Sequence, residues 1–307
     1  MQLNYHDLHE AFKSVKANHG CAGVDGVTIG AFESDIRHNL QKLEYELSSG
    51  SYFPLPLLKI LVDKGKDDGE FRTLCIPAVR DRIAQTAVLN LIEPMLEKEF
   101  EDCSFAYRKG RSVKQAILTI KECYEQGYRW VVDSDIDAFF DNVSHELLLE
   151  RFKRVIHDPE IRSLVAQWIA PEVWDGEKLF TLEKGIPQGS PVSPILANLF
   201  LDELDEVMLG SGYKFIRYAD DFVVLCKNPK EAGDALELSK KVLDRLHLIL
   251  DEEDIVSFDQ GFKYLGVMFI KSMIMVPFDR PKRKKRAVSW PKPFNLDLYM
   301  LKRKQGW

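Results

Sequence analysis

The chain has 307 residues, of which 45% are hydrophobic and 29% charged, and its formal net charge at pH 7 is −6. This composition predicts a globular protein of one large or two ordinary domains. No apolar run approaches the ~20 residues of a membrane helix, and the N-terminus lacks a signal-peptide core, so we expect a cytoplasmic protein with no membrane partner. The five cysteines lack CxxC spacing, which argues against a zinc site or a disulfide framework.

Charge is unevenly distributed along the chain. Residues 280–307 carry ten Lys and Arg against a single acid, Asp297, although the chain as a whole is acidic. A basic segment on an acidic body favours phosphate contact at that end. The alternative is a solvated, disordered tail.

The first part of the chain alternates helical and extended patterns. Residues 57–62 (LLKILV) and 71–77 (FRTLCIP) are typical of strands, and the charged turn between them predicts a hairpin. Apolar residues at helical spacing predict helices over residues 3–17, 31–48, 80–100 and 112–126.

The second part predicts a sheet whose strands end in acids. WVVDSDIDAFF (130–140) is typical of a buried strand that runs into a turn, and FIRYADDFVVLC (215–226) of a hairpin with a charged tip. KYLGVMFI (263–270) predicts a last strand. Helical spacing recurs over residues 144–156, 193–209 and 231–249. Together these elements predict an α+β fold.

The acids at the strand ends are the strongest chemical signal. Asp220 and Asp221 interrupt an apolar hairpin, and Asp133, Asp135 and Asp137 follow another apolar run. Adjacent carboxylates raise each other's pKa unless a cation neutralises them, and oxygen ligands favour Mg²⁺. Two such ions ~4 Å apart suit in-line phosphoryl displacement. The alternative is that these aspartates are helix caps and turn residues.

Several segments in this order resemble the motifs of reverse transcriptases of the group II intron type. They are YADD (218–221), WVVDSDIDAFFDNVSH (130–145), GIPQGSPVSPILANLFLDELD (185–205), FRTLCIPAVRDRIAQTAV (71–88), SFAYRKGRSVKQAI (104–117), AGVDGVTI (22–29) and FKYLGVMF (262–269). The resemblance covers roughly residues 20–270. It implies a right-hand polymerase with fingers and palm, in which a ferredoxin-like antiparallel palm sheet packs on helices and the thumb is short or absent.

The resemblance assigns the catalytic and metal-binding residues. Asp135, Asp220 and Asp221 match the metal ligands, and the Ile136 carbonyl would add a backbone ligand. Two Mg²⁺ ions are implied, for which Mn²⁺ can substitute. One ion would lower the pKa of the primer 3′-hydroxyl and the other would stabilise the pyrophosphate leaving group.

The resemblance also implies substrate contacts. Phe140 matches the residue that stacks under the sugar and excludes a 2′-hydroxyl, and Gln188 with Gly189 matches the nucleotide-contacting turn. Arg72 matches a fingers residue that grips the triphosphate, and Lys66 is a weaker candidate. Nucleic-acid contacts are expected from Arg108, Lys109, Arg111, Lys282, Arg283, Lys284, Lys285 and Arg286. The alternatives are solvated charges and, for the first three, capping of the helix that follows.

We expect three ranges: an N-terminal extension and fingers with parts of the palm (1–130), the palm (131–275) and a basic C-terminal tail (276–307). The chain departs from the family pattern in two respects. Asp254 stands where a lysine that can protonate pyrophosphate is expected, and no large thumb or maturase region follows residues 262–269, which resemble the primer-grip motif. In the second respect the chain resembles the CRISPR-associated branch of the family, in which such enzymes copy RNA for spacer acquisition beside an integrase.

The function implied is that of an RNA-directed DNA polymerase acting on an RNA template, a DNA or RNA primer and dNTPs. A CRISPR integrase or another defence protein is the expected partner. Asp254 leaves open a second hypothesis, a catalytically weak or inactive RNA-binding scaffold or maturase. A third, an RNA-making polymerase, is disfavoured by the bulk of Phe140.

Overall fold

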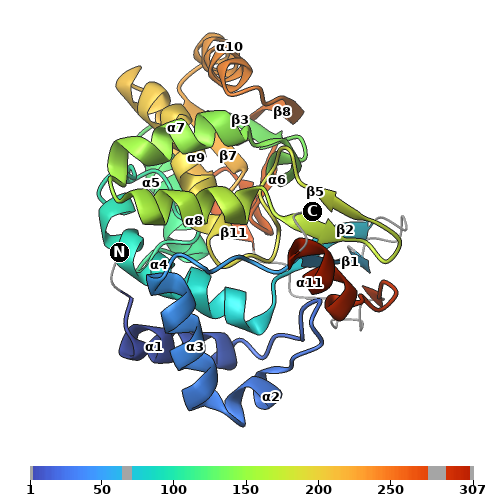
Figure 1. Ribbon diagram of the computed structural model, residues 1–307. Helices are drawn as coiled ribbons and strands as arrows, with labels where there is room; N and C mark the ends of the chain where they lie inside the picture. Colours follow the sequence, from blue (N-terminus) through green and yellow to red (C-terminus); the bar gives the residue numbers. More distant parts are fainter. Residues whose placement is uncertain (1–2, 64–70, 276–287, 305–307) are drawn as a thin grey trace. The chain divides into compact units, whose positions relative to one another are not determined.

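The computed structural model describes residues 3–63, 71–275 and 288–304 (Figure 1). Its helices are α1 (Tyr5–Ala17), α2 (Ile29–Glu33), α3 (Ile36–Ser48), α4 (Val79–Leu96), α5 (Val113–Glu125), α6 (Phe139–Asn142), α7 (His145–Val155), α8 (Pro159–Ile169), α9 (Ser193–Gly210), α10 (Pro229–Arg245) and α11 (Leu296–Lys304). Its strands are β1 (Leu57–Asp63), β2 (Phe71–Ile76), β3 (Trp130–Ile136), β4 (Glu172–Trp174), β5 (Leu179–Thr181), β6 (Lys214–Tyr218), β7 (Asp221–Cys226), β8 (Leu250–Ser257), β9 (Phe262–Tyr264), β10 (Val267–Ile270), β11 (Met273–Met275) and β12 (Val288–Ser289).

None of the helices in the described ranges combines the length and the hydropathy that crossing a bilayer would require.

The chain divides into two compact units, each discontinuous in sequence. Unit 1 comprises Met1–Pro94, Lys153–Ser193 and Arg283–Trp307, and unit 2 comprises Met95–Phe152 and Pro194–Lys282. The sequence instead suggested three contiguous ranges. The units differ from those ranges because segments far apart in the chain pack together, so a break in composition does not mark a boundary in space.

Unit 1 is built on helices at its N-terminal end. α1 begins with a capping box, in which the Asn4 side chain accepts from the Asp7 amide and the Asp7 side chain accepts from the Asn4 amide. α1 and α3 pack side by side (Figure 1). At the start of α4, the buried Asp81 carboxylate accepts from the Tyr52 hydroxyl at 3.0 Å and from the Leu55 amide at 2.9 Å. These bonds fix the chain where it enters β1.

Unit 1 also holds a five-stranded sheet centred on β1. The predicted hairpin is confirmed, because β1 pairs with β2 in antiparallel register from Leu58↔Ile76 to Asp63↔Phe71. The start of β1 pairs with β4 in parallel, and its end pairs with β12 in antiparallel register. The hairpin is therefore the centre of a larger sheet.

Part of the basic C-terminal segment belongs to this sheet. β12 pairs with β1, and the Trp174 indole N–H donates to the Lys292 carbonyl at 2.8 Å. Phe294, Leu296 and Met300 pack on the buried cluster of Val24, Leu55 and Ala78. The alternative of a disordered tail is therefore wrong for residues 288–304, of which Phe294, Leu296 and Met300 pack on unit 1.

Unit 2 contains the antiparallel palm sheet that the resemblance implied. Its strand order is β6-β7-β3-β8, and every adjacent pair is antiparallel. In chain order the strands and their crossover helices read β3, α9, β6, β7, α10 and β8, which is the ferredoxin-like βαββαβ arrangement. α+β architecture with a ferredoxin-like palm is thus confirmed.

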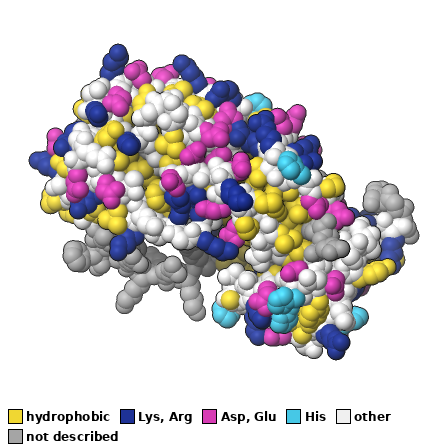
Figure 2. All heavy atoms as spheres, turned by 90° about the vertical axis from the view of Figure 1, so that its left-hand side faces the viewer, with side chains coloured by type: hydrophobic (Ala, Val, Ile, Leu, Met, Phe, Trp, Pro, Cys, Tyr) yellow, Lys and Arg dark blue, Asp and Glu magenta, His cyan; other side chains and the backbone are white. Residues whose placement is uncertain are grey.

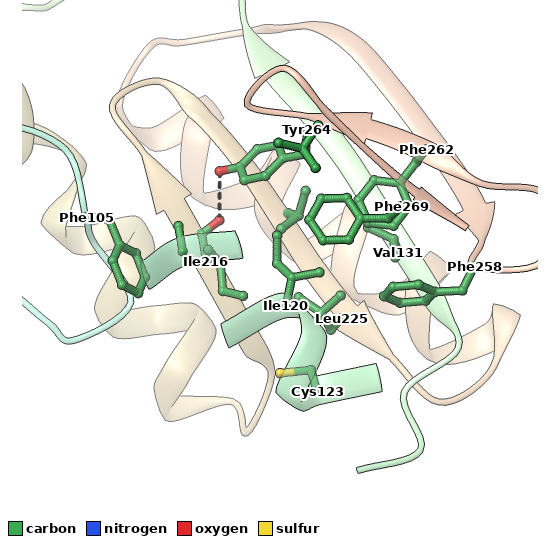
Figure 3. Close-up of a cluster of buried hydrophobic side chains, with 13 residues drawn as sticks. Phe105, Ile120, Cys123, Val131, Ile216, Leu225, Phe258, Phe262, Tyr264 and Phe269 are labelled. Atoms are coloured by element: carbon green, nitrogen blue, oxygen red, sulfur yellow. Dashed lines mark hydrogen bonds between the residues drawn. The ribbon is translucent and has the colours of Figure 1, made fainter. Parts of the chain in front are cut away.

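The two faces of the palm sheet pack differently. On one face, Val131, Ile216, Val223 and Leu225 join α5 and the β9–β10 hairpin in a cluster rich in aromatic side chains (Figure 3). The opposite face packs on α10 and receives the side chains of Phe215 and Phe222, whose ring centroids are 5.2 Å apart. Alternation along the strands therefore buries the sheet on both sides.

Three predicted elements differ from those observed. The predicted helix over 31–48 is two helices, because Ser34 and Asp35 cap and interrupt it. The predicted strand over 263–270 is a hairpin: Leu265 (φ +49°) and Gly266 (φ +76°) form a two-residue turn between Tyr264 and Val267. The segment 250–257, rich in acids, was not predicted as a strand but forms β8.

Candidate active site

The predicted catalytic aspartates lie at the ends of two neighbouring strands. Asp135 is the penultimate residue of β3, and Asp220 and Asp221 lie where β6 turns into β7. The β3–β7 register runs from Trp130↔Cys226 to Ser134↔Phe222, so extending it by one residue places Asp135 opposite Asp221. Because paired residues share a face, both side chains lie on the face of Val131 and Val223.

A tight turn presents Asp220. Tyr218 pairs with Asp221, which leaves Ala219 and Asp220 as the two turn residues. Ala219 has a φ of +63°, a left-handed conformation that is uncommon for a residue other than glycine. Asp220 is half-buried and Asp221 is exposed. Hairpins with two-residue turns need such backbone angles, so the turn is held in a conformation that its sequence does not favour.

The electrostatics of these carboxylates suit a cation. Burial raises the pKa of Asp220 above its ordinary value, and its own backbone amide and Arg217 only partly offset this effect. One Asp135 carboxylate oxygen accepts from the Ile136 amide at 2.9 Å. A bound divalent ion would favour the ionised form of a carboxylate in this position.

Carboxylate oxygens with one backbone carbonyl are the donor set that Mg²⁺ prefers, so the residues fit the implied ion in chemistry and in register. In the described part of the chain, no three His, Cys, Asp or Glu side chains are already grouped as a metal site. The fit therefore rests on strand pairing and donor type.

β8 adds further acids to the same face. Asp254 pairs with Asp133 in the β3–β8 ladder, and the register shifts between Asp135 and Ile136. Like charges directly opposite on a sheet repel each other, and bulges of this kind are frequent near active sites. The exposed Asp254, which stands where the family pattern has a lysine, thus faces the side of the sheet that carries Asp135.

A buried ion pair lies behind the turn. Arg217 and Asp205 are both fully buried, and the guanidinium Nε and Nη2 donate to the two carboxylate oxygens at 2.7 and 2.5 Å. Arg217 Nη1 also donates to the Asn198 side-chain oxygen at 3.1 Å and to the Ala219 carbonyl at 2.9 Å. Bidentate pairing and these carbonyl contacts satisfy the guanidinium where water is excluded.

A second acid of α9, Asp202, lies one helical turn before Asp205 of this pair. Asn198, Asp202 and Asp205 recur at helical spacing and so share one face of α9. Asp202 is 6% exposed, and one of its carboxylate oxygens has no hydrogen-bond partner. Burial, together with the charges of Asp205 and Glu206, raises the pKa of Asp202 to about 7.

Phe140 lies just beyond β3 in the short helix α6. Its ring meets the buried Phe139 ring edge to face, with centroids 5.4 Å apart. Ala138, at φ +41°, turns the chain between β3 and α6. Phe140 is half-buried, so one part of its ring is packed and another part is accessible.

Three of the residues predicted to contact the substrate, Arg72, Gln188 and Gly189, belong to unit 1. The Cys75 amide of β2 donates to the Gln188 carbonyl at 2.7 Å, which joins the turn at 188–189 to the strand that carries the exposed Arg72. Gly189 has a φ of +117°, and a Cβ there would lie 2.6 Å from the Cys75 carbonyl oxygen. Only glycine fits this approach.

The predicted basic contacts have different environments. Arg108 is buried, and it donates to Glu97 Oε1 at 2.9 Å and to the carbonyls of Ser104 at 2.9 Å and Phe100 at 3.2 Å. Its expected phosphate contact is therefore corrected to a structural role, because its donors are used within unit 2. Arg111 pairs with Asp102, and Lys109 is exposed. Five predicted basic residues and one fingers residue lie outside the described residues: Lys282, Arg283, Lys284, Lys285, Arg286 and Lys66.

Sequence reasoning missed three buried residues near the Asp220–Asp221 turn, namely Arg217, Asp205 and Tyr264. An arginine between Ile216 and Tyr218 in a buried strand needs a buried acid as its partner, and the acids of α9 recur on one helical face. Those two signals were present in the sequence. The role of Tyr264 depends on the β9–β10 turn, which was not predicted.

Comparisons with known proteins agree with this architecture. Residues 63–269 match the family described as reverse transcriptase (RNA-dependent DNA polymerase). The protein YkfC of Escherichia coli is 33% identical over 290 residues, which cover 81% of this chain and 76% of YkfC. The group II intron-encoded protein LtrA of Lactococcus lactis is 32% identical over 210 residues, 67% of this chain but only 34% of LtrA.

Among solved structures, one described as a partial Cas6-RT-Cas1--Cas2 complex aligns at 29% identity with a TM-score of 0.47. The alignment covers 78% of this chain and 40% of that one. The chain thus spans less than half of the matched chain in that complex.

The buried Asp202 generates a prediction on stability. Because the folded-state pKa of about 7 lies above the ordinary value, the protonated acid stabilises the fold at low pH, and this contribution is lost as the pH rises to 7. We expect Asp202→Asn to be more stable than wild type at pH 8, and the difference to shrink by up to about 1.4 kcal/mol per pH unit below pH 7. Urea unfolding at pH 5.5 and 8 measures it.

The control for this prediction is Asp205→Asn, which leaves Arg217 buried without its charge partner. That variant should be less stable than wild type at both pH values, by about 3–5 kcal/mol. A difference between Asp202→Asn and wild type that does not vary with pH would show that Asp202 is ionised in the folded protein.

Proposed function

Because the chain belongs to the reverse transcriptase family, we propose that it is an RNA-directed DNA polymerase that extends a primer 3′-hydroxyl with deoxynucleotides. The observation that carries the proposal is the strand register that aligns Asp135 with the Asp220–Asp221 turn at one end of a ferredoxin-like palm sheet. This arrangement would place oxygen ligands together at one end of the two interior strands of a rigid sheet.

Asp135, Asp220, Asp221 and the Ile136 carbonyl would hold two Mg²⁺ ions. When bound, the ions supply Lewis-acid activation of the 3′-hydroxyl and neutralise charge on the triphosphate and the leaving pyrophosphate. The role of the protein is to hold the ligand oxygens, and through them the ions, in position. The half-buried Asp220 and the exposed Asp221 present carboxylates from consecutive positions, so they are available to groups on different sides of the turn.

Residues of unit 1 would bind the incoming nucleotide. The exposed Arg72 guanidinium suits bidentate contact with phosphate oxygens. The turn at Gln188 and Gly189 is tied to the same strand by the Cys75 amide. The side chain of Gln188 is half-buried, and the glycine at 189 lets this turn approach the Cys75 carbonyl closely enough to hold Gln188 beside β2.

Phe140 would select the sugar. Its ring is supported by the buried Phe139, so it is not free to swing away from a bulkier substrate. A fixed aromatic surface under C2′ leaves no room for a hydroxyl and offers it no hydrogen-bond partner. This supports a DNA-making over an RNA-making polymerase.

Nucleic-acid contact is proposed for local basic segments. Figure 2 shows Lys and Arg side chains interspersed with Asp and Glu over the face that it presents. Because the net charge of the chain is −6, attraction of a template would come from segments in which positive charge is concentrated, such as residues 282–286. Arg108 is excluded from this role by its internal contacts.

One observation favours a second candidate function, an RNA-binding scaffold with weak or no catalysis. Asp254 places another negative charge opposite Asp133, where the family pattern has a cation. The CRISPR integrase or other defence partner implied by the sequence resemblance stays a prediction. The partial Cas6-RT-Cas1--Cas2 complex is by its name an assembly of that kind, but its TM-score of 0.47 gives no argument for this chain.

Primer extension on an RNA template tests the proposal. We expect wild type to extend an annealed primer with Mg²⁺ and dNTPs, and Asp221→Ala to be slower by at least about 100-fold, because the loss of a metal ligand exceeds the effect of a supporting residue. Asp259→Ala, which changes another exposed aspartate of unit 2, should match wild type. RNA binding without extension by any of the three would favour the scaffold.

Sugar selection is tested with Phe140→Ala. Opening the space under the sugar should raise the ratio of ribonucleotide to deoxynucleotide incorporation by at least about 10-fold, as kcat/KM measured with each substrate. Phe140→Tyr retains the bulk of the ring and should keep the wild-type ratio. Equal ratios in all three proteins would remove Phe140 from the selection of the sugar.

The basic segment is tested by charge neutralisation. Deleting residues 280–307 would also remove β12 and α11, so we favour replacing the five basic residues at 282–286 with glutamine. The slope of log affinity against log salt should fall by about 0.7–0.9 for each phosphate that the variant no longer neutralises. An unchanged slope would mean that the segment does not bind phosphate. The control replaces five exposed lysines elsewhere, Lys13, Lys16, Lys42, Lys230 and Lys241.

A further inference from the structure

The turn that carries Asp220 and Asp221 is contacted by one buried side chain on each face of the palm sheet. Tyr264, 3% exposed, lies on the face of Val131 and Val223. Arg217 belongs to the opposite face, because it pairs with Phe222. The two side chains contact the main-chain carbonyls on either side of Asp220, those of Ala219 and Asp221. Neither makes a described hydrogen bond to the carboxylates of Asp220 or Asp221.

Tyr264 contacts both strands of the catalytic hairpin. Its hydroxyl lies 3.1 Å from the Asp221 carbonyl oxygen of β7 and 3.5 Å from the Ile216 carbonyl oxygen of β6. Figure 3 shows the phenol pointing out of the aromatic cluster toward Ile216. Because a hydroxyl has one proton and a buried carbonyl needs a donor, this oxygen is the polar link between the cluster and the turn.

The β9–β10 hairpin fixes the position of that hydroxyl. Tyr264 immediately precedes the left-handed turn at Leu265 and Gly266. On the same two strands the rings of Phe262 and Phe269 stack with centroids 5.0 Å apart and an interplanar angle of 9° (Figure 3). Phe258 packs edge to face on Phe262 at 5.2 Å. The tyrosine thus extends from a rigid aromatic support.

Arg217 is fixed in a similar way from the other face. Asp205 of α9 grips its guanidinium through both carboxylate oxygens, and Asn198 of α9 accepts a third bond. One donor, Nη1, also reaches the Ala219 carbonyl at 2.9 Å. The left-handed residue of the turn is therefore hydrogen-bonded to a group that cannot move without breaking a buried ion pair.

We propose that Tyr264 and Arg217 are positioning residues that hold the main chain on both sides of Asp220 and so set the directions of the Asp220 and Asp221 carboxylates. Arg217 holds the residue before Asp220, and Tyr264 holds the residue after it. This inference rests on the proposed function, because it gives those carboxylates their role as metal ligands.

The physical basis is the tolerance of a metal site. Ligand oxygens must be held within about 0.5 Å of the productive geometry, and a two-residue turn with one left-handed alanine has little intrinsic preference for such a position. A backbone conformation of this kind persists only when its surroundings over-determine it. Two carbonyl contacts from opposite faces supply that constraint.

The test is Tyr264→Phe in the full chain, which removes one oxygen and keeps the ring in its cluster. Tyr124→Phe is the matched control, since Tyr124 packs on the same cluster at 4.9 Å from Phe258 and its hydroxyl makes no described hydrogen bond to the turn. Three quantities are measured: the dissociation constant for Mn²⁺ alone, followed by electron paramagnetic resonance; the melting temperature; and kcat and KM for primer extension.

We expect Tyr264→Phe to weaken Mn²⁺ binding and to lower kcat, each by about 10-fold, as supporting residues of metal ligands do. The KM for dNTPs should be unchanged, and the melting temperature should change by no more than about 4 °C. Tyr124→Phe should match wild type throughout. Mn²⁺ affinity equal to wild type in Tyr264→Phe would overturn the inference, whether the melting temperature falls or not.

Arg217→Lys provides the second variant, because lysine keeps the charge beside Asp205 but cannot span Asp205, Asn198 and the Ala219 carbonyl together. If it folds, its Mn²⁺ affinity should also fall by about 10-fold; wild-type affinity would overturn the role of Arg217. If it does not fold, Asn198→Ala, which removes one acceptor of the guanidinium, takes its place with the same expectation and the same contrary outcome.

The Mn²⁺ measurement separates this inference from the proposed function. Wild type that binds Mn²⁺ but does not extend a primer would contradict polymerase activity, and the effect of Tyr264→Phe on Mn²⁺ affinity would still decide the inference. Wild type that binds no Mn²⁺ would overturn both.

Discussion

The buried pair of Arg217 and Asp205 is the interaction on which the candidate active site depends. A charged side chain inside a sheet is costly unless its partners satisfy it completely, and here α9 supplies two partners and the turn before Asp221 supplies a third. The pair therefore links the position of a helix to the position of a turn. A shift of α9 along its axis would therefore displace the Ala219 carbonyl first, before it moved the carboxylates that are proposed as metal ligands.

The palm sheet carries acidic side chains on strands that are otherwise apolar and buried. Its interior strands β3 and β7 are mostly buried. Their acids are Asp133 and Asp135 of β3 and Asp221 at the start of β7, and the edge strand β8 adds Asp254 opposite Asp133. Asp221 is exposed to water at the start of β7, whereas the aromatic cluster excludes water from the rest of this face of β3 and β7. A cation there would meet carboxylates on a rigid backbone, two of which, Asp135 and Asp220, are only partly exposed to water, a combination that favours coordination over ion pairing with mobile surface charges.

Much of this arrangement could be predicted from the sequence, and the exceptions have physical reasons. Acids at the ends of apolar strands are conspicuous in the sequence, but the choice of Asp135, Asp220 and Asp221 among them came from the resemblance to reverse transcriptases. Arg108 was misassigned because a basic loop residue looks the same in sequence whether it binds phosphate or three carbonyls of its own unit. β8 was missed because its acids break the apolar alternation, and only pairing with β3 makes it a strand. The β9–β10 turn was missed because Leu265 is a poor candidate for a left-handed residue.

Unit 1 is assembled from the beginning, the middle and the end of the chain, and this has a consequence for biosynthesis. A ribosome releases β1 and β2 early, but the end of β1 gains its partner β12 only after residues 288–289 have been made. Until then the edge of β1 presents unpaired amides and carbonyls, and the side chains that α11 covers are open to solvent. Unit 2, complete by residue 282, can fold first. The nascent protein therefore passes through a stage in which its sheet edge is a target for aggregation or for a chaperone.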